Sequence, residues 1–226
     1  MAEIPGASAR GFARAGVYEI TWREYGEAVR RGGCRTPIGV QVQSNPYNAR
    51  WLDERAPPDD KRFSSTLPVT GVNSADIECY LRWLNGATVR NFRLPSPDQW
   101  RWLAYGESRS RFPWGEEAEF GRANVGVGGR FHFDVATLGR PNTYDTVLPV
   151  GRFAPNAFGL YDVIGNAKEY IGQCEPRTLG VSQSTRPTCV AMGGYAPPVI
   201  EDPREPERFF MLNDGSVSSI GFRIIE

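Results

Sequence analysis

The sequence lacks several features that would place it in a functional class at once. It has no apolar run long enough to span a membrane, and its first residues lack the apolar stretch of a secretion signal. We therefore expect no membrane insertion and, for the chain as given, a cytoplasmic protein. A leader preceding Met1 would instead direct it to the periplasm or the exterior. The 26 Lys and Arg residues equal the 26 Asp and Glu residues, which argues against a nucleic-acid partner.

Metal-binding and nucleophilic side chains are also scarce. His132 is the one histidine, between two aromatic residues, and a non-haem iron triad needs two histidines. The four cysteines, Cys34, Cys79, Cys174 and Cys189, do not have the spacing of a zinc site. Cys174 and Cys189 alone are close enough in sequence to suggest a loop-closing disulfide. We favour free, buried thiols as the simpler alternative.

The chain is rich in residues that anchor and interrupt regular structure. Its 226 residues include 25 Gly, 18 Pro, 6 Trp, 9 Tyr and 12 Phe. Aromatic residues at this level are typical of a folded chain, because disordered low-complexity segments contain few of them. We find no linker and no internal repeat, and therefore expect a single domain over residues 1–226 with long ordered loops.

Capping residues predict three helices in the first half of the chain. Each start is a Ser, Thr or Asn before apolar residues at helical spacing, and each end is a glycine. The three segments start at Thr21, at Asn73 or Ser74, and at Ser96, and they end at Gly32, Gly86 and Gly106. Pro97 and Gln99 make the third start the clearest.

Strand-like runs are short and few. They cover residues 16–20, 147–153, 189–192 and 220–225. Residues 35–68 and 107–149 carry turn-forming residues without a helical or strand period. A few short strands with two or three helices and much irregular structure indicate an α+β domain.

Nine short motifs follow one another in an informative order. They include the Gly-Asn turn of NAFGLYDVIGNAKEY at 156–170 and the final Gly221-Phe222-Arg223. All nine lie at residues 18–21, 68–73, 82–84, 92–100, 112–115, 149–151, 156–169, 192–194 and 221–223. This order resembles the formylglycine-generating enzyme family of sulfatase-modifying-factor domains, over essentially the whole chain. The resemblance implies a C-type-lectin-like α+β fold with short antiparallel strands.

For the turn at 162–169 the resemblance implies a bound calcium ion. The matching positions are Asp162 and Glu169 for side-chain oxygens, with Gly165 and Ala167 for backbone carbonyls. A hard cation takes several oxygen ligands, and a turn that contains glycine lets carbonyls and carboxylates converge. On spacing alone, the alternative is that Asp162 caps a turn and Glu169 is solvated.

A second calcium site of the family matches residues just upstream. The positions are Asn124, Val125, Asn142 and Tyr144, and Asn142 stands where the family often has an aspartate. Loss of that charge should weaken the ion. The alternative is an Asn- and Thr-rich loop without metal. We therefore expect one calcium site, or two.

The chain departs from the family in ways that bear on chemistry. Lys168 and Tyr170 replace the two tryptophans of the family's Trp-Glu-Trp, so the local packing or the partner surface should differ. Oxidising members hold copper(I) with two cysteine thiolates near the final Gly-Phe-Arg, because a soft ion needs soft ligands. Residues 190–226 contain no cysteine. We expect no copper and no formylglycine-generating oxidase activity.

Three functions remain open at this point. The first, which we favour, is a non-catalytic binding or regulatory protein that recognises a peptide or protein through loops rigidified by calcium. The second is an oxidoreductase of a divergent branch, acting in peptide or siderophore maturation without the copper-binding cysteines. The third, a ligand-display protein, fits poorly because residues 195–219 lack the composition of such tracts. The candidate partner-binding residues are Tyr195, Arg208, Phe209, Phe210 and Asn213, although burial of Phe209 and Phe210 in the core is equally expected.

Overall fold

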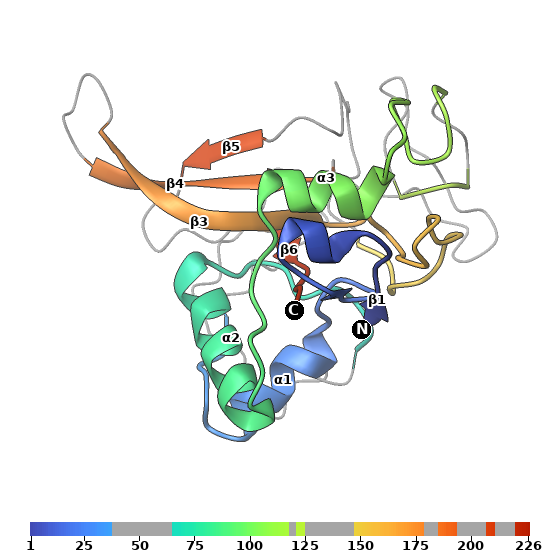
Figure 1. Cartoon of the computed structure of the whole chain (residues 1–226). Coiled ribbons are helices and arrows are strands. Elements are labelled where there is room, and N and C mark those ends of the chain that lie inside the picture. The colour runs from blue at the N-terminus through green and yellow to red at the C-terminus, as the bar shows by residue number, and fades with distance from the viewer. Residues whose placement is uncertain (38–64, 118–120, 125–146, 179–184, 194–206, 211–219) are drawn as a thin grey trace, which may run out of the picture.

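Figure 1 shows the computed structural model of the chain. The structure describes residues 1–37, 65–117, 121–124, 147–178, 185–193, 207–210 and 220–226. Side chains are described for these residues except 173–178, 185–188 and 207–210. No helix in the described part of the chain is long and apolar enough to cross a membrane.

The three expected helices are present, and local side-chain bonds explain where each begins. They are α1 (Trp22–Arg30), α2 (Ser74–Thr88) and α3 (Pro97–Tyr105). Thr21, Asn73 and Ser96 are the N-caps, and each forms a capping box with the residue three positions later. A short 3-10 helix, η1 (Ala7–Arg10), precedes them.

The end of α2 differs from the sequence expectation. The helix runs through Gly86 and ends at Thr88, followed by Val89 in the left-handed region at φ 54°. Valine is branched at Cβ and is strained in this conformation. Its side chain is 93% exposed, so packing does not offset that strain. Asn85 supports the helix end, because its side chain donates to and accepts from the backbone of Phe92.

A four-stranded sheet crosses the molecule in the order β5-β4-β3-β6. Its strands are β3 (Lys168–Thr178), β4 (Thr185–Met192), β5 (Glu207–Phe210) and β6 (Ile220–Phe222). β6 pairs with β3 in parallel, and the other neighbours are antiparallel. A separate two-stranded sheet joins β1 (Ala2–Glu3) and β2 (Arg14–Ala15). The α+β class is confirmed.

The strand expectations were only partly correct. The run at 189–192 lies inside β4, and the run at 220–225 contains β6. Residues 16–20 and 147–153 form no strand. The first segment makes separate backbone bonds to Phe222 and Ile224 and accepts from Tyr161 and Val69, and the second contains a turn at Gly151, φ 79°. β3 was missed because Gly172 and Pro176 interrupt its strand-like pattern.

The strand β3 separates two apolar clusters. Tyr170 packs in a cluster with α1 and α2, whereas the adjacent Ile171 packs in a cluster with α3 and the N-terminal segment. Consecutive side chains of a strand point to opposite faces, which explains the division. Figure 1 shows α3 on one side of the sheet and α1 and α2 on the other.

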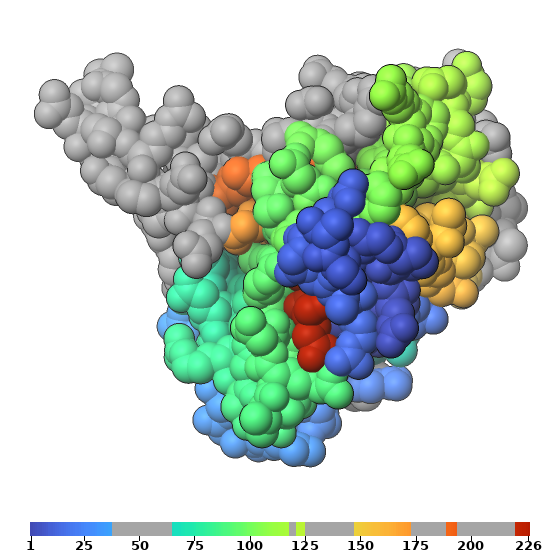
Figure 2. All heavy atoms as spheres, in the orientation of Figure 1, coloured from blue at the N-terminus to red at the C-terminus, as the bar shows by residue number. Residues whose placement is uncertain are grey.

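The two ends of the chain lie side by side. Arg14 and Glu226 exchange backbone hydrogen bonds of 3.0 and 2.9 Å, and Ala15 forms an antiparallel bridge with Ile225. Figure 2 shows the C-terminal residues, in red, framed by the N-terminal segment and by the segment that includes α3. The C-terminal segment is therefore part of the core of the fold.

A disulfide joins Cys34, just after α1, to Cys79 in α2, and the sequence analysis did not foresee it. Cys189 is also disulfide-bonded, and none of the described cysteines is free. The expectation of free, buried thiols was therefore wrong. The 45-residue separation hides the first bond in the sequence, because the packing of α1 against α2 brings the two cysteines together.

Replacing Cys34 and Cys79 together by Ser should lower the free energy of unfolding by about 2–4 kcal/mol, because the cross-link no longer restricts the unfolded chain. Urea unfolding measures the loss, and mass spectrometry of a non-reduced digest should show the two cysteines in one linked peptide. An unchanged unfolding midpoint in the double variant would contradict the expected role of the bond.

Candidate functional site

The turn at 162–169 has an unusual backbone. Asp162 (φ 54°), Gly165 (φ 83°) and Asn166 (φ 59°) all adopt left-handed conformations. Aspartate and asparagine tolerate this region better than other side chains that carry a Cβ. The turn is held on both sides, because Gly165 donates its N–H to the carbonyl of Gly193 and Asn166 donates to that of Asn124. The sequence therefore presents a rigid loop at this position.

Glu169 is the counter-ion of a buried arginine. Its Oε1 accepts from Nε of Arg223 at 2.9 Å and from Nη2 at 2.7 Å, and its Oε2 accepts from the indole N–H of Trp100 at 2.6 Å. Both charged residues are 0% exposed. The idea that Glu169 is a solvated carboxylate is therefore excluded. The sequence analysis used Arg223 only as part of a motif and missed this pairing.

The remaining donors of Arg223 bind backbone carbonyls. Nη1 donates to Gly16 at 2.8 Å and to Val17 at 2.9 Å, and Nη2 donates to Tyr161 at 2.7 Å. These carbonyls belong to the N-terminal segment and to the loop that precedes Asp162. One guanidinium thus connects three segments that are distant in the sequence.

A third buried acid, Glu19, lies beside the same turn. Its two carboxyl oxygens accept from the N–H of Ala167 at 2.9 Å and from the side-chain amide of Asn166 at 3.0 Å. Burial raises the pKa of Glu19 well above its ordinary value, and the nearby carboxylates of Asp162 and Glu169 raise it further. The sequence analysis did not predict Glu19 as a site residue. It lies within the first of the nine motifs, at residues 18–21, and nothing else in the sequence marks it.

Asn166 connects this cluster to the predicted second calcium site. Its side-chain oxygen accepts from the N–H of Leu148 at 2.7 Å and from the side chain of Asn124 at 3.4 Å. Asn124 is 5% exposed. Asn124, a predicted ligand of the second calcium site, therefore contacts the turn at 162–169. Val125, Asn142 and Tyr144 lie outside the described residues.

Asp162 combines burial with a carboxyl oxygen that is still available. Its side chain is largely buried, and Oδ2 accepts from the N–H of Gly151 at 2.6 Å. The other oxygen has no hydrogen-bond partner among the residues that the structure describes. Burial raises the pKa of Asp162, while the Gly151 N–H and the charge of Arg223 act in the opposite direction.

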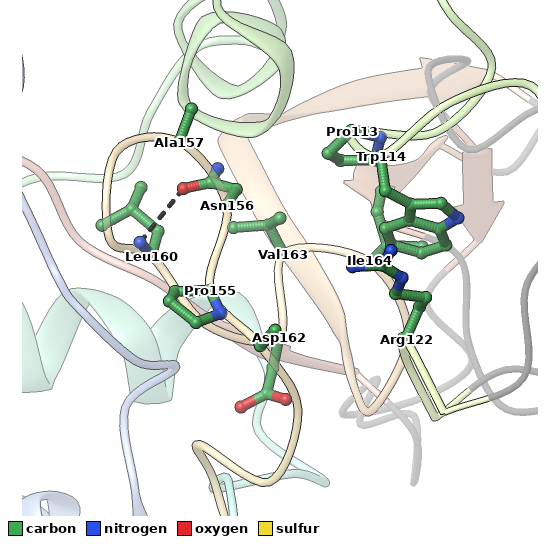
Figure 3. Close-up of a pocket in the computed structure, with 11 residues that line it drawn as sticks. Pro113, Trp114, Arg122, Pro155, Asn156, Ala157, Leu160, Asp162, Val163 and Ile164 are labelled. Carbon is green, nitrogen blue, oxygen red and sulfur yellow. Dashed lines mark hydrogen bonds between the residues drawn. The ribbon is translucent and has the colours of Figure 1, made fainter.

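Asp162 also lines a pocket of about 130 Å³. Figure 3 shows Trp114 above Arg122 on one side of this pocket and Asp162 on the other. Asn156 lies beside Leu160 in Figure 3, and both ends of its side-chain amide are used: it donates to the carbonyls of Leu103 and Ala104 and accepts from the N–H groups of Phe158 and Leu160. The amide of Asn156 is therefore fully used, whereas Asp162 keeps one carboxyl oxygen at this pocket.

The oxygen ligands available at the turn can be counted from these contacts. Oε1 of Glu169 already accepts two hydrogen bonds, whereas Oε2 accepts one and keeps a free lone pair. One of the two carboxyl oxygens of Asp162 accepts no hydrogen bond from the described residues. No group of three or more His, Cys, Asp or Glu side chains in the described part of the chain converges as a metal site. A calcium ion here would thus need the backbone carbonyls of Gly165 and Ala167 as well.

The predicted partner-binding residues are only partly covered by the structure. Tyr195 and Asn213 lie outside the described residues. Arg208, Phe209 and Phe210 belong to β5, where they pair in register with Val190, Cys189 and Thr188 of β4, but their side chains are not described. Their role stays a prediction.

The structure describes both positions at which the chain departs from the family motif. Tyr170 is 2% exposed, and its hydroxyl donates to the carbonyl of Val72 at 3.2 Å. It is thus a core residue, bonded to the loop before α2. Lys168, at the start of β3, is partly exposed. The expected change in local packing or partner surface stays a prediction.

Comparisons with known proteins agree with this architecture. A family profile described as the sulfatase-modifying factor enzyme 1-like domain matches residues 8–226. A Bos taurus protein named inactive C-alpha-formylglycine-generating enzyme 2 is 32% identical over 124 residues, which is 54% of this chain and 38% of that protein. The formylglycine-generating enzyme of Mus musculus is 31% identical over 182 residues, or 74% and 46% of the two chains. The chain thus spans less than half the length of either relative.

Two solved structures show the same fold. CarF superposes with a TM-score of 0.65 at 18% identity, covering 100% of this chain and 92% of its own. PvdO from Pseudomonas aeruginosa gives a TM-score of 0.63 at 21% identity, covering 95% and 81%. At these identities the likeness concerns the fold alone, and it supports the expected C-type-lectin-like architecture.

Replacing Glu169 by Gln should lower the free energy of unfolding by about 3–5 kcal/mol, because the change leaves the charge of Arg223 buried without a counter-ion. Glu226→Gln is the matched control, since its ion pairs with Arg14 and Arg90 are partly exposed and should contribute less than about 1 kcal/mol. If urea unfolding showed equal losses of free energy in the two variants, the buried ion pair would contribute no more to stability than the exposed ones.

Proposed function

The chain belongs to the sulfatase-modifying factor enzyme 1-like domain family, and from this premise we propose that it is a non-catalytic binding or regulatory member. Its function is to recognise a peptide or protein through a surface built on rigid loops. The Bos taurus relative whose name describes it as inactive is compatible with this proposal.

The distribution of cysteines is the observation that supports the proposal most directly. Copper(I) is held by thiolates, and a cysteine in a disulfide has no thiolate to offer. Cys34, Cys79 and Cys189 are all disulfide-bonded, and no cysteine follows Cys189 in the sequence. None of these three cysteines therefore offers a thiolate to copper(I), and no cysteine stands between Cys189 and the C-terminal Gly221-Phe222-Arg223.

The disulfides also bear on where the protein works. Structural disulfides form and persist in oxidising compartments, and the cytosol usually keeps thiols reduced. We place the action of this protein in the periplasm or outside the cell.

An oxidoreductase of a divergent branch, acting in peptide or siderophore maturation, is the alternative. Such an enzyme needs a pocket in which several polar groups converge on a substrate. In the pocket beside Asp162 the side chain of Asn156 is already fully hydrogen-bonded. Asp162 keeps a carboxyl oxygen that no described residue uses, and this oxygen in the pocket is the observation that favours the alternative.

The turn at 162–169 is where calcium would rigidify the loops. Asp162 with the carbonyls of Gly165 and Ala167 would hold the ion, and Glu169 would add its remaining lone pair. Bound calcium would supply positive charge to a buried cluster in which three acids, Glu19, Asp162 and Glu169, face one arginine. The excess of acidic groups supports this assignment, because uncompensated buried carboxylates are costly.

The absence of oxidase chemistry can be tested directly. The protein should take up no stoichiometric, tightly bound copper(I), and it should not convert a cysteine-containing peptide to its formylglycine product in the presence of oxygen. Copper titration and mass spectrometry of the peptide measure both, with an active formylglycine-generating enzyme as the positive control. Tight binding of one cuprous ion together with turnover would overturn the proposal.

Calcium binding can be tested by comparing melting temperatures in calcium and in chelator. The wild-type protein should melt higher with calcium, by an amount that corresponds to about 2.7 kcal/mol at a hundredfold excess over Kd. Asp162→Asn should lose this response, because it removes the charge yet retains an oxygen for the Gly151 N–H and tolerates a positive φ. Asp98→Asn, at an exposed aspartate of α3, is the control. An unchanged response in Asp162→Asn would exclude this site.

A further inference from the structure

A pocket of about 280 Å³ lies between the end of η1 and α3. Arg10, the last residue of η1, lines one side. The other side is one face of α3, formed by Asp98, Arg101, Trp102 and Tyr105, together with the turn that follows the helix. Figure 1 shows the N-terminal segment, in dark blue, alongside α3. The pocket shares no lining residue with the one in Figure 3.

The side chain of Arg10 has a defined position. Its Cζ lies over the indole ring of Trp102, 3.6 Å from the ring centroid, which is a cation–π contact. The backbone of Arg10 is fixed as well, because its carbonyl accepts from the side chain of Gln99 in α3 at 2.6 Å. The indole in turn packs on Gly6, where a Cβ would lie 3.1 Å from the ring. The positive charge is therefore held over one ring.

The charge of Arg10 is not compensated by the described residues. Its guanidinium forms no hydrogen bond and no ion pair within the described part of the chain. Arg101, the other arginine of the pocket, forms an ion pair with Asp98 at 2.8 Å. These two charges balance each other, so the net charge of the lining residues is the single positive charge of Arg10.

The indole N–H of Trp102 is a second donor without an acceptor. Among the described residues it is the one buried side-chain nitrogen or oxygen that lacks a hydrogen-bond partner. This N–H is covered, so the accessible donors of the pocket are those of Arg10. Both unsatisfied groups are donors, which favours a ligand that accepts hydrogen bonds and carries negative charge. A carboxylate has both properties.

A stacked arginine is well suited to bind a carboxylate. The N–H groups of a guanidinium point outward in its plane, so contact of one face with a ring leaves the edge available for two parallel hydrogen bonds. A single positive charge matches one carboxylate, whereas a phosphate group with about two negative charges would need a further cation. The rings of Trp102 and Tyr105 offer an apolar surface to the stem of an acidic side chain.

From these observations we propose that the pocket binds the side chain of an Asp or Glu residue in a peptide partner. The carboxylate occupies the edge of the Arg10 guanidinium, and the side-chain stem lies against Trp102 and Tyr105. This assignment rests on the proposed function as a peptide-recognising protein, and it names the site and the class of partner.

A phage-displayed library of linear peptides is the probe, selected on the full chain. Enriched sequences should share an Asp or Glu at one aligned position. An enriched peptide is then synthesised with a fluorophore, once as selected and once with this acid replaced by the corresponding amide. Fluorescence anisotropy measures the two dissociation constants, and the amide peptide should bind the wild-type protein about tenfold more weakly.

Arg10→Gln should weaken binding of the acidic peptide about tenfold and should bind the acidic and amide peptides within about twofold of each other, because both changes remove the same contact. Arg10→Lys keeps the charge but cannot form two parallel hydrogen bonds, so its affinity should lie between those of Arg10→Gln and the wild type. Arg82→Gln is the matched control, because it removes the same charge at an exposed position of α2 outside the pocket. Its affinity should stay within about twofold of the wild type.

The possible failures of this test have different meanings. Enriched peptides without a shared acid, or an acidic peptide that binds Arg10→Gln as tightly as the wild type, would overturn the pocket assignment and leave peptide recognition intact. Equal losses in Arg10→Gln and Arg82→Gln would indicate a general effect of net charge and would overturn the assignment too. A library that yields no binding sequence on the wild type would overturn both the pocket and the proposed function.

Discussion

The ion pair between Glu169 and Arg223 is the interaction on which the arrangement of the molecule depends. It is fully buried, and it joins β3 to the segment that follows β6. Through its other donors Arg223 also holds the N-terminal segment and the loop before Asp162, and Trp100 brings α3 to the same carboxylate. A buried guanidinium needs all of its hydrogen bonds satisfied, so these segments have little freedom to move independently.

The same pair shapes the chemistry of the turn. Arg223 uses Oε1 of Glu169 for two hydrogen bonds. Asp162 is therefore the acid best placed to bind a cation, because its second oxygen is not used by the described residues. Glu19 adds a third acid with a raised pKa. The cluster therefore has three carboxyl groups and one arginine. A proton on Glu19 or a cation near Asp162 would neutralise the remaining negative charge.

The proposal of recognition without catalysis rests on hydrogen-bonded loops and on the disulfide bonds of the described cysteines. The disulfide between Cys34 and Cys79 fixes the segment after α1 against α2. Tyr170 is buried, and its hydroxyl donates to the carbonyl of Val72 in the loop before α2.

The sequence by itself determined the features that rest on near neighbours. The caps at Thr21 and Ser96 bond to residues three positions away, so the starts of α1 and α3 could be predicted. The ordered motifs were enough to identify the family and the α+β class. β3 could not be predicted, because Gly172 and Pro176 belong to a strand only once β4 and β6 pair with it.

Only the tertiary structure decided the partners of the buried charges and of the cysteines. Arg223 lies 54 residues from Glu169, Glu19 lies 148 residues from Ala167, and Cys34 lies 45 residues from Cys79. Nothing local distinguishes these residues from solvated charges or free thiols. Their pairing follows from the packing of segments that are distant in the chain, and burial then makes each pairing necessary.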